Sequence, residues 1–381
     1  MRLYSKEEWA MIPWPATDEG IRMRSFFEPL LKEGISTFIS NASSQLYILH
    51  IDDLFIPLTV NEKEYRNSYI CSIYSFILYA EEEMKRHRKH LLRTLLYPFL
   101  QLMKLWFRIT KINQLVIVNN FLLSTNLYDN NLLPDQARRL CHFLQNQFPH
   151  HAIVFRSLNR YTEQELTDTL HALGSCLITT RSIYFFDPNQ YSSLSSKKRW
   201  IIQKDKKLVE QDKIEIVRHH DFQSLDAPAI KKLYDLLYLE KYSNFNPAFT
   251  TRFFEQVIQD KNFTLIGIRY EGNLAGFIGY FKQKGVMTTP IVGYDTTLPE
   301  TLGLYRMLTA QVLQESLASC TIFHMMSSGV GHFKRQRGAF QELEAMAVLC
   351  THLPFFRRFI WKTLGALFNK VGAKVLIKYK L

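Results

Sequence analysis

Hydrophobic and polar residues change their spacing along the chain, and each change predicts a different element of secondary structure. Residues 36 to 60 alternate apolar and polar side chains around the pair Asp52-Asp53, which is the pattern of a β-hairpin. Residues 87 to 108 instead place leucines and aromatic residues at helical spacing, with basic and polar residues on the other side. Pro98 should kink or split this helix, because proline lacks the N–H that a helix interior needs.

The next part of the chain, up to Phe186, alternates between the two kinds of pattern. Runs typical of strands lie at 114–123, 151–158 and 175–186. Helical patterns lie between them, at 134–148 and 162–174. Short strands separated by amphipathic helices favour an α/β unit with a mixed sheet.

A second unit follows a helix at 192–211 in which lysines and arginines outnumber acids. Its expected order is two helices, three antiparallel strands with short turns, a helix, a strand, a short helix and a last strand. These elements lie at 226–241, 249–260, 263–270, 274–281, 286–294, 298–319, 320–326, 327–340 and 342–350. Pro299 suits the first turn of the helix at 298–319, where a missing N–H costs nothing.

Composition limits the class of protein. With 381 residues, 47% of them hydrophobic, the chain is long enough for two folded domains. A formal net charge of +12 favours an anionic partner such as a phosphorylated cofactor, nucleic acid or lipid headgroups. The five cysteines are scattered and form no C-x-x-C pair, so neither a disulfide framework nor a metal site is predicted.

The two ends of the chain bear on its location. Acidic residues and a proline come before any long apolar run at the N-terminus, unlike a secretory signal, so we expect a cytoplasmic protein. No apolar run is long enough to predict a transmembrane helix. After Glu344 there is no acidic residue, and lysines and arginines alternate with aromatic residues, which is typical of a peripheral segment on the inner face of a membrane. The same segment could instead cap a core and turn its lysines to water.

Three stretches of the second unit carry a resemblance to a known family. They are YSSLSSKKRWIIQKDKKLVEQD before the sheet, LAGFIGYF on a central strand and the glycine-flanked turn SSGVGHFKRQRGAF. From Tyr191 to Cys350 the chain resembles the GNAT (acyl-CoA N-acyltransferase) superfamily, in the branch similar to Fem-type peptidoglycan-bridge transferases. The N-terminal unit resembles a first, degenerate copy of a tandem GNAT arrangement. The expected fold is therefore α/β, with GNAT-like domains at 1–187 and 188–350, each a mixed sheet flanked by helices, and a basic amphipathic segment at 351–381.

The resemblance implies an N-acyltransferase that moves an acyl group from an acyl-CoA-type donor, acetyl-CoA among them, to an amine acceptor. An amino acid, a peptide and a lipid or cell-wall precursor are the candidate acceptors. In GNAT folds two central strands splay to admit the donor and a helix N-terminus binds its pyrophosphate, since the first N–H groups of a helix are unpaired. Fem-type relatives use aminoacyl-tRNA, which makes a tRNA-dependent transferase one alternative. A non-catalytic GNAT-shaped module that binds anionic membrane or nucleic acid is another.

Two helix starts, near Thr297 and near Gly331, are the candidate binding sites for the donor. The candidate donor-binding residues are Thr297, Gly303, Arg306, Ser328, Gly329, Gly331, Lys334 and Arg337. TTLPETLGLYR replaces the usual glycine-rich pyrophosphate loop, and its arginine comes only in the second helical turn. We expect Gly331 to lie in a surface turn, where glycine permits close backbone approach.

The candidate catalytic residues are Asp295, Tyr305 and His332. Asp295 follows a strand end and could orient an amine or act as a base, although aspartate is also common in turns. Phe333 stands where many GNAT enzymes carry the tyrosine that protonates the leaving thiolate, so Tyr305 or His332 would have to supply that proton. The sequence contains none of the short motifs of P-loop, dinucleotide-binding, zinc-protease or serine-hydrolase sites.

Overall fold

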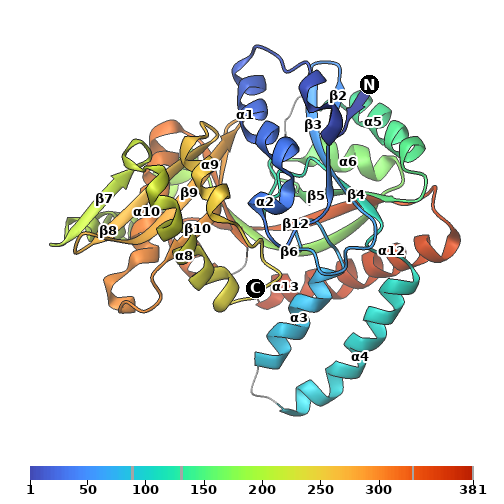
Figure 1. Ribbon diagram of the computed structural model, residues 1–381. Coiled ribbons are helices and arrows are strands. Elements are labelled where there is room, and N and C mark those ends of the chain that lie inside the picture. Colours follow the sequence, from blue (N-terminus) through green and yellow to red (C-terminus); the bar gives the residue numbers. More distant parts are fainter. Residues whose placement is uncertain (87–89, 129–131, 328–329, 380–381) are drawn as a thin grey trace. The chain divides into compact units, whose positions relative to one another are not determined.

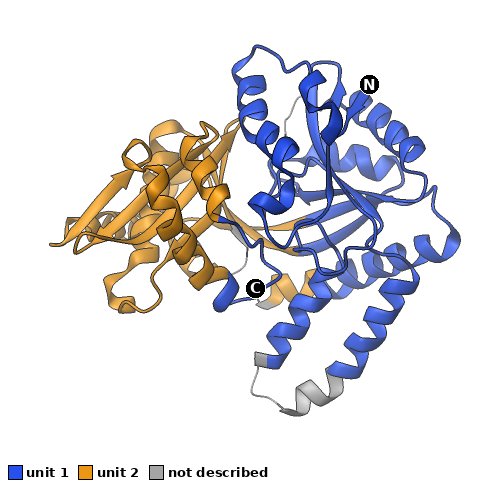
Figure 2. Cartoon of the chain, viewed as in Figure 1, with its two compact units in different colours: residues 1–180, 239–250, 345–372 blue, residues 181–238, 251–344, 373–381 orange. Residues whose placement is uncertain are grey.

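A computed structural model (Figure 1) describes residues 1–86, 90–128, 132–327 and 330–379 of the chain. These residues form two compact units (Figure 2). Unit 1 comprises residues 1–180, 239–250 and 345–372, and unit 2 comprises residues 181–238, 251–344 and 373–381. The strands belong to one mixed sheet of 12 strands, and in each unit helices pack on its part of that sheet, so the predicted α/β fold is confirmed.

The sheet of unit 1 has the strand order β1-β2-β3-β4-β5-β12. Its strands are β1 (Arg2–Tyr4), β2 (Gln45–Ile51), β3 (Leu54–Asn61), β4 (Leu115–Val118), β5 (Ala152–Leu158) and β12 (Phe340–Leu349). All neighbours are antiparallel except β4 and β5, which are parallel. The predicted hairpin is confirmed at its turn, Asp52-Asp53, although its first strand begins at Gln45 and not at residue 36.

The sheet of unit 2 repeats this plan with the strand order β7-β8-β9-β10-β11-β6. Its strands are β7 (Ile214–Arg218), β8 (Phe263–Tyr270), β9 (Asn273–Gln283), β10 (Val286–Tyr294), β11 (Ile322–Ser327) and β6 (Cys176–Phe186). Here too, the fourth and fifth strands in this order, β10 and β11, are parallel and the other neighbours are antiparallel. The order of strands and helices expected from the sequence is therefore present in unit 2, and unit 1 repeats its strand order.

The last strand of each sheet comes from the other half of the sequence. In chain order β6 follows β5, yet it pairs with β11, and β12 follows β11, yet it pairs with β5. Strands β6 and β12 consequently have residues in both units. The predicted limits at 187 and 350 divide the chain into consecutive repeats, whereas the compact units interleave, and these limits stay a prediction.

Helices cover both faces of the unit 1 sheet. They are α1 (Asp18–Glu33), α2 (Ile35–Phe38), α3 (Ser75–Arg86), α4 (His90–Ile109), α5 (Pro134–Gln147), α6 (Gln164–Ala172) and α12 (Phe355–Leu367). Along β4, Val116 and Val118 point to the core under α5 and α6, whereas Leu115 and Ile117 point to the core under α3, α4 and α12. A strand buried on both faces explains the uninterrupted apolar run in its sequence. Helix α4 continues through Pro98, which does not split it.

The helices of unit 2 likewise pack on two faces of its sheet. They are α7 (Ser196–Lys206), α8 (Ala227–Asp235), α9 (Thr251–Gln259), α10 (Leu304–Ser319), α11 (Gly331–Gln336) and α13 (Ala373–Tyr379). A side chain at Gly293 would meet the backbone of α8, and one at the neighbouring sheet position Gly276 would meet Leu308 of α10. The helix predicted from residue 298 begins instead at Leu304. Gly303, at φ 76°, separates it from the short turn that follows Pro299.

Candidate functional site

The two parallel strands at the centre of unit 2 part before they end. Pairing joins Val286–Thr288 of β10 to Ile322–His324 of β11. Within the described residues it goes no further, although β10 continues to Tyr294 and β11 to Ser327. The splay expected from the resemblance is therefore present. Among the described residues, the part of β10 beyond Thr288 has no strand pairing with β11 on this edge.

A change of register accompanies the parting. On its other edge β10 stays paired with β9, but the register shifts between Thr288 and Ile291. An extra residue at such a β-bulge bends the strand and increases its twist. The bulge lies where the pairing with β11 ends, so it accounts for the change of direction that opens the edge.

Helix α10 begins beside the carboxyl end of β10. Gly303 takes the left-handed conformation at its N-cap, and no side chain caps the helix there. The first N–H groups of a 16-residue helix therefore lack intrahelical partners, and the helix dipole is positive at that end. This end of α10 is suited to an anionic group.

Three aromatic rings connect the ends of the elements that surround the open edge. Tyr305, in the first turn of α10, has its ring centroid 6.1 Å from that of Tyr294, the last residue of β10. On its other side it lies 5.1 Å from the ring of Phe333 in α11. The predicted catalytic Tyr305 is thus half-buried beside both the strand end and the helix that follows β11.

The other predicted catalytic residues lie at the surface of the same region. One carboxylate oxygen of Asp295 accepts hydrogen bonds from the backbone N–H and the hydroxyl of Thr297, at 2.9 and 2.6 Å. Asp295 therefore shapes the turn after β10, and Thr297 is its partner there. His332 is exposed on α11, and its Nε2 lies 2.8 Å from Nε2 of Gln336. The catalytic roles of Asp295 and His332 stay predictions.

Lys334 and Arg337 are both buried cations of the predicted site. Each residue is 4% exposed, and Nζ of Lys334 lies 5.5 Å from the ring centroid of Tyr184 on β6. Arg335 donates a hydrogen bond of 2.6 Å to the hydroxyl oxygen of the same tyrosine. Burial, with a smaller contribution from the charge of Arg181, lowers the pKa of Lys334 to about 7. Close to neutral pH this amine can both hold and release a proton.

The two predicted arginines share a buried carboxylate. Arg306 donates from Nε and Nη2 to Oδ1 of Asp205 at 2.9 and 2.6 Å, and Arg337 donates from Nε to Oδ2 at 2.6 Å. Arg337 also covers the ring of Phe333, 3.4 Å from its centroid. Asp205 thereby ties α7, α10 and α11 together. Binding of a donor by either arginine stays a prediction.

Gly331 is buried, and its expected place in a surface turn is wrong. A Cβ atom there would lie 2.5 Å from the hydroxyl oxygen of Tyr184. Its small size is therefore needed for α11 to pack on β6. Ser328 and Gly329, also predicted to bind the donor, lie outside the described residues.

Sequence reasoning missed a group of polar residues that the strand exchange brings together. Arg181 of β6 makes a bidentate ion pair with Glu344 of β12, with both N–O distances at 2.9 Å. His324 of β11 is fully buried and stacks on Phe185, and within the described residues its Nε2 has no hydrogen-bond partner. Burial, then the charges of Arg181 and Lys334, holds the pKa of His324 well below its usual range. The signal in the sequence that could have revealed this group is that Arg181, His324 and Glu344 each interrupt an apolar run typical of a strand.

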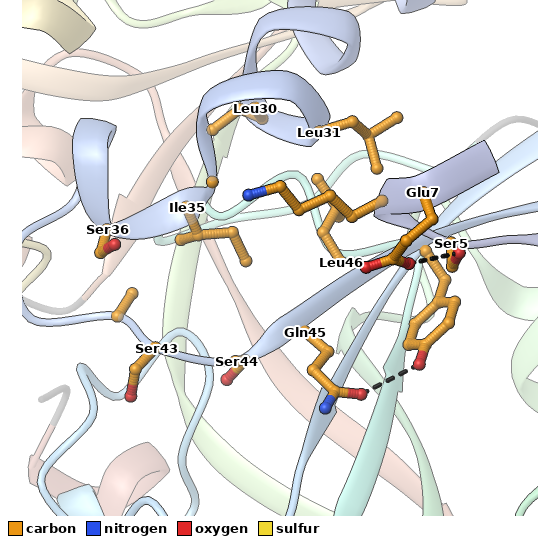
Figure 3. A pocket seen from close by; sticks show the side chains of 14 residues that line it. Ser5, Glu7, Leu30, Leu31, Ile35, Ser36, Ser43, Ser44, Gln45 and Leu46 are labelled. Carbon is orange, nitrogen blue, oxygen red and sulfur yellow. Dashed lines mark hydrogen bonds between the residues drawn. The ribbon is translucent and has the colours of Figure 1, made fainter. Parts of the chain in front are cut away.

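The described residues contain no cluster of three or more histidine, cysteine or acidic side chains that could hold a metal ion. A pocket of about 370 Å³ lies in unit 1, between α1, α2 and β2 (Figure 3). Two pairs of its polar groups already bond to each other, Ser5 to Glu7 at 2.7 Å and Tyr47 to Gln45 at 2.9 Å. None of the predicted site residues lines it.

The chain as a whole resembles known proteins only in the course of its backbone. No family model matches it, and no curated protein matches it. Among solved structures it is similar to L-PGS from Bacillus licheniformis, at 15% identity and a TM-score of 0.47, over 66% of this chain and 83% of that one. It is similar to FemX at 9% identity and a TM-score of 0.42, over 61% and 79%. It is also similar to a GCN5-related N-acetyltransferase from Kribbella flavida, at 12% identity and a TM-score of 0.33, over 62% and 80%. Each likeness concerns the course of the chain alone.

Proposed function

We propose that the protein is a transferase that moves an acyl group onto an amine, and that unit 2 holds its active centre. The observation that carries this proposal is the parting of β10 and β11 beside the uncapped start of α10. The free edge of β10 can hydrogen-bond an extended, amide-containing donor arm as a further strand would. The start of α10 can hold the donor's phosphates. An acyl-CoA-type donor has both parts.

The transfer requires one bond to form and one to break. The acceptor nitrogen attacks the carbonyl carbon of the thioester, the carbon–sulfur bond breaks, and the thiolate leaves. The attacking amine loses a proton, and the thiolate gains one. Lys334 is our candidate acceptor of the first proton, since burial lowers its pKa to about 7. The hydroxyl of Tyr305 is our candidate donor of the second, because Phe333 beside it has no proton to give.

An aminoacyl-tRNA donor would react in the same way, with an oxygen as the leaving group. The net charge of +12 is compatible with such a donor, and so is the basic helix α7, whose Lys197, Lys204 and Trp200 face solvent. A non-catalytic module that binds an anionic surface would need neither the parted strands nor a lysine with a pKa near neutrality, so we favour a transferase. Between the two donors we favour the coenzyme A thioester, because its amide-containing arm and its phosphates suit the edge of β10 and the start of α10.

The experiment has two steps on the purified full chain. Native mass spectrometry of the freshly isolated protein shows which small molecules copurify. Titration calorimetry with acetyl-CoA then measures affinity and stoichiometry, and a parallel assay measures transfer from aminoacyl-tRNA. Saturable binding of one acetyl-CoA per chain supports the proposal. Transfer from aminoacyl-tRNA without binding of acetyl-CoA would mean that aminoacyl-tRNA is the donor. Inactivity with both donors would contradict the proposal that the protein is a transferase.

A further inference from the structure

Helix α4 of unit 1 exposes a row of large apolar side chains. Phe99, Leu102, Leu105 and Ile109 are 53%, 64%, 56% and 70% exposed. Their spacing puts them on one side of the helix. Single exposed apolar residues are common on protein surfaces, but a continuous row of four marks a surface that meets an apolar phase.

The opposite side of α4 is firmly attached to unit 1. Phe107 is buried in the core under α3, α4 and α12, and Leu100, Met103 and Trp106 pack against that core. Lys104 forms an ion pair with Glu81 of α3, so the two helices make a hairpin that projects from unit 1 (Figure 1). The exposed row is therefore a fixed feature of a packed helix.

Helix α12 extends this row with aromatic residues. Phe355, Phe356 and Phe359, at its start, are 64%, 78% and 50% exposed. The ring of Phe359 lies 6.5 Å from the ring of Trp106 on α4, which makes the two rows neighbours. We call the exposed residues Phe99, Leu102, Leu105, Ile109, Phe355, Phe356 and Phe359 the α4–α12 surface.

The two segments that form this surface carry positive charge alone. Residues 84–128 contain eight lysines and arginines and no acidic residue. Residues 345–381 contain seven and again no acidic residue. Among them Arg108, Lys362 and Lys370 are exposed. Apolar residues on two segments without acidic side chains match the chemistry of an anionic lipid layer, where the chains are apolar and the headgroups negative. The neighbouring α3 does carry acids, and Glu81 among them is paired with Lys85 and Lys104.

We propose that the α4–α12 surface docks the protein on membranes containing anionic phospholipid. The leucine, isoleucine and phenylalanine side chains enter the headgroup boundary, and the lysines and arginines contact the lipid phosphates. No described helix is long and apolar enough to cross a membrane, so α4 and α12 would lie along its surface. Leu102, Leu105 and Ile109 offer a nucleic acid neither hydrogen-bonding groups nor rings that could stack on bases, whereas a lipid layer takes up these side chains as well as the phenylalanines. This favours lipid over nucleic acid as the partner. This inference is independent of the proposed activity.

Flotation of the full chain with vesicles tests the apolar part of the proposal. Vesicles of phosphatidylcholine with about one third phosphatidylglycerol should carry the protein upward, and pure phosphatidylcholine vesicles should carry far less. Leu102→Asn should weaken the partitioning about tenfold, since it removes an apolar side chain from the interface. Leu225→Asn is the matched control, because Leu225 is 75% exposed in unit 2 and its loss should change nothing. Equal binding of both variants would overturn the proposal.

Charge reversal tests the electrostatic part. Lys362→Glu combined with Lys370→Glu should reduce binding to the anionic vesicles at least about twentyfold, given the effect of each surface cation near anionic lipid. Lys261→Glu, at an exposed lysine of unit 2, is the control and should bind nearly as the natural protein does. Circular dichroism should show all variants folded. Failure of the natural protein to float with anionic vesicles would overturn membrane docking. If that protein instead bound an unrelated DNA duplex, the surface would be assigned to nucleic acid.

Discussion

The two units share one strand order but differ at the parallel pair in the middle of the sheet. In unit 1 every residue of β4, Leu115 to Val118, pairs with β5. In unit 2 the pairing of β10 with β11 ends at Thr288, six residues before β10 itself ends at Tyr294. The same fold thus contains one closed and one open version of its central pair.

The chain after β4 shows how unit 1 is closed. Asn119, at φ 55°, turns the chain out of the strand direction, and the following segment to Tyr128 is largely buried. The hydroxyl of Tyr128 donates to the carbonyl of Arg156 at 2.6 Å, and the N–H of Asn126 donates to Oγ of Ser157 at 3.1 Å. These bonds fasten the segment to the part of β5 beyond the paired residues. In unit 1 the chain itself thus occupies the place beside the fifth strand that, in unit 2, lies next to the parted strands β10 and β11.

The helix that follows the fifth strand also differs between the units. In unit 1 it is preceded by Glu163, and burial raises the pKa of that carboxyl to about 8. In unit 2 the corresponding helix contains Lys334, and burial lowers its pKa to about 7. Burial disfavours the charged form of both groups, which is a carboxylate in unit 1 and an ammonium group in unit 2. These two groups should therefore change the stability with pH in opposite directions.

The largest expected effect comes from the buried carboxylate of unit 2. Arg337→Ala removes one of the two arginines that hold Asp205, which should lower the free energy of unfolding by about 3 to 5 kcal/mol. The control is Arg139→Ala, which breaks the exposed ion pair with Asp52 in unit 1 and should leave stability unchanged within error. Chemical denaturation measures both. A stable Arg337→Ala protein with weakened donor binding would instead assign Arg337 to the donor.

Lys334 should make unit 2 more stable as the pH rises. Between about pH 7, its folded pKa, and about pH 10.5, its ordinary value, the unfolded chain binds more protons than the folded one. Stability contributed by this group therefore increases with pH across that window, by a few kcal/mol in all. Lys334→Met removes the titration, so the difference in unfolding free energy between the natural protein and this variant should rise from pH 7 to 10. A constant difference would show that Lys334 keeps an ordinary pKa.

Glu163 should have the opposite effect in unit 1. Its folded pKa of about 8 exceeds the ordinary value of 4.5, so the folded chain binds more protons between these values. Its contribution to stability is present below about pH 4.5 and is lost as the pH rises through 8. Glu163→Gln keeps the shape and cannot titrate, so its unfolding free energy should fall less than that of the natural protein between pH 5 and 8. Parallel curves would contradict the raised pKa.

Tyr305→Phe gives a smaller, purely catalytic effect. The variant keeps the ring that packs between Tyr294 and Phe333 but loses the hydroxyl. We expect transfer to slow about a hundredfold, the scale of a lost proton donor, with an unchanged melting temperature. Tyr191→Phe is the control, since the hydroxyl of Tyr191 takes part in an exposed hydrogen bond, which it accepts from Nε2 of Gln203 at 3.0 Å. Full activity in Tyr305→Phe would remove Tyr305 from the mechanism.

The sequence predicted the order of elements well and their three-dimensional grouping less well. Alternating and helical spacing located β8 to β12, because those patterns report local burial. Pro299 favours a first helical turn and so predicts a helix from residue 298, whereas the left-handed Gly303 sets the actual start of α10 at Leu304. The burial of Gly331 against Tyr184 depends on β6 pairing with β11, a contact between distant parts of the sequence. No local pattern carries that information.

The most direct test of the account is hydrogen–deuterium exchange with and without saturating acetyl-CoA. The donor should slow exchange along β10 from Ile291 to Tyr294 and in the first turn of α10, because these backbone groups form its proposed binding surface. Exchange should stay unchanged along β4 and in the segment from Asn119 to Tyr128, where unit 1 is closed. Protection of the unit 1 segment, or unchanged exchange along β10 in protein shown to bind the donor, would contradict the claim that unit 2 alone is open.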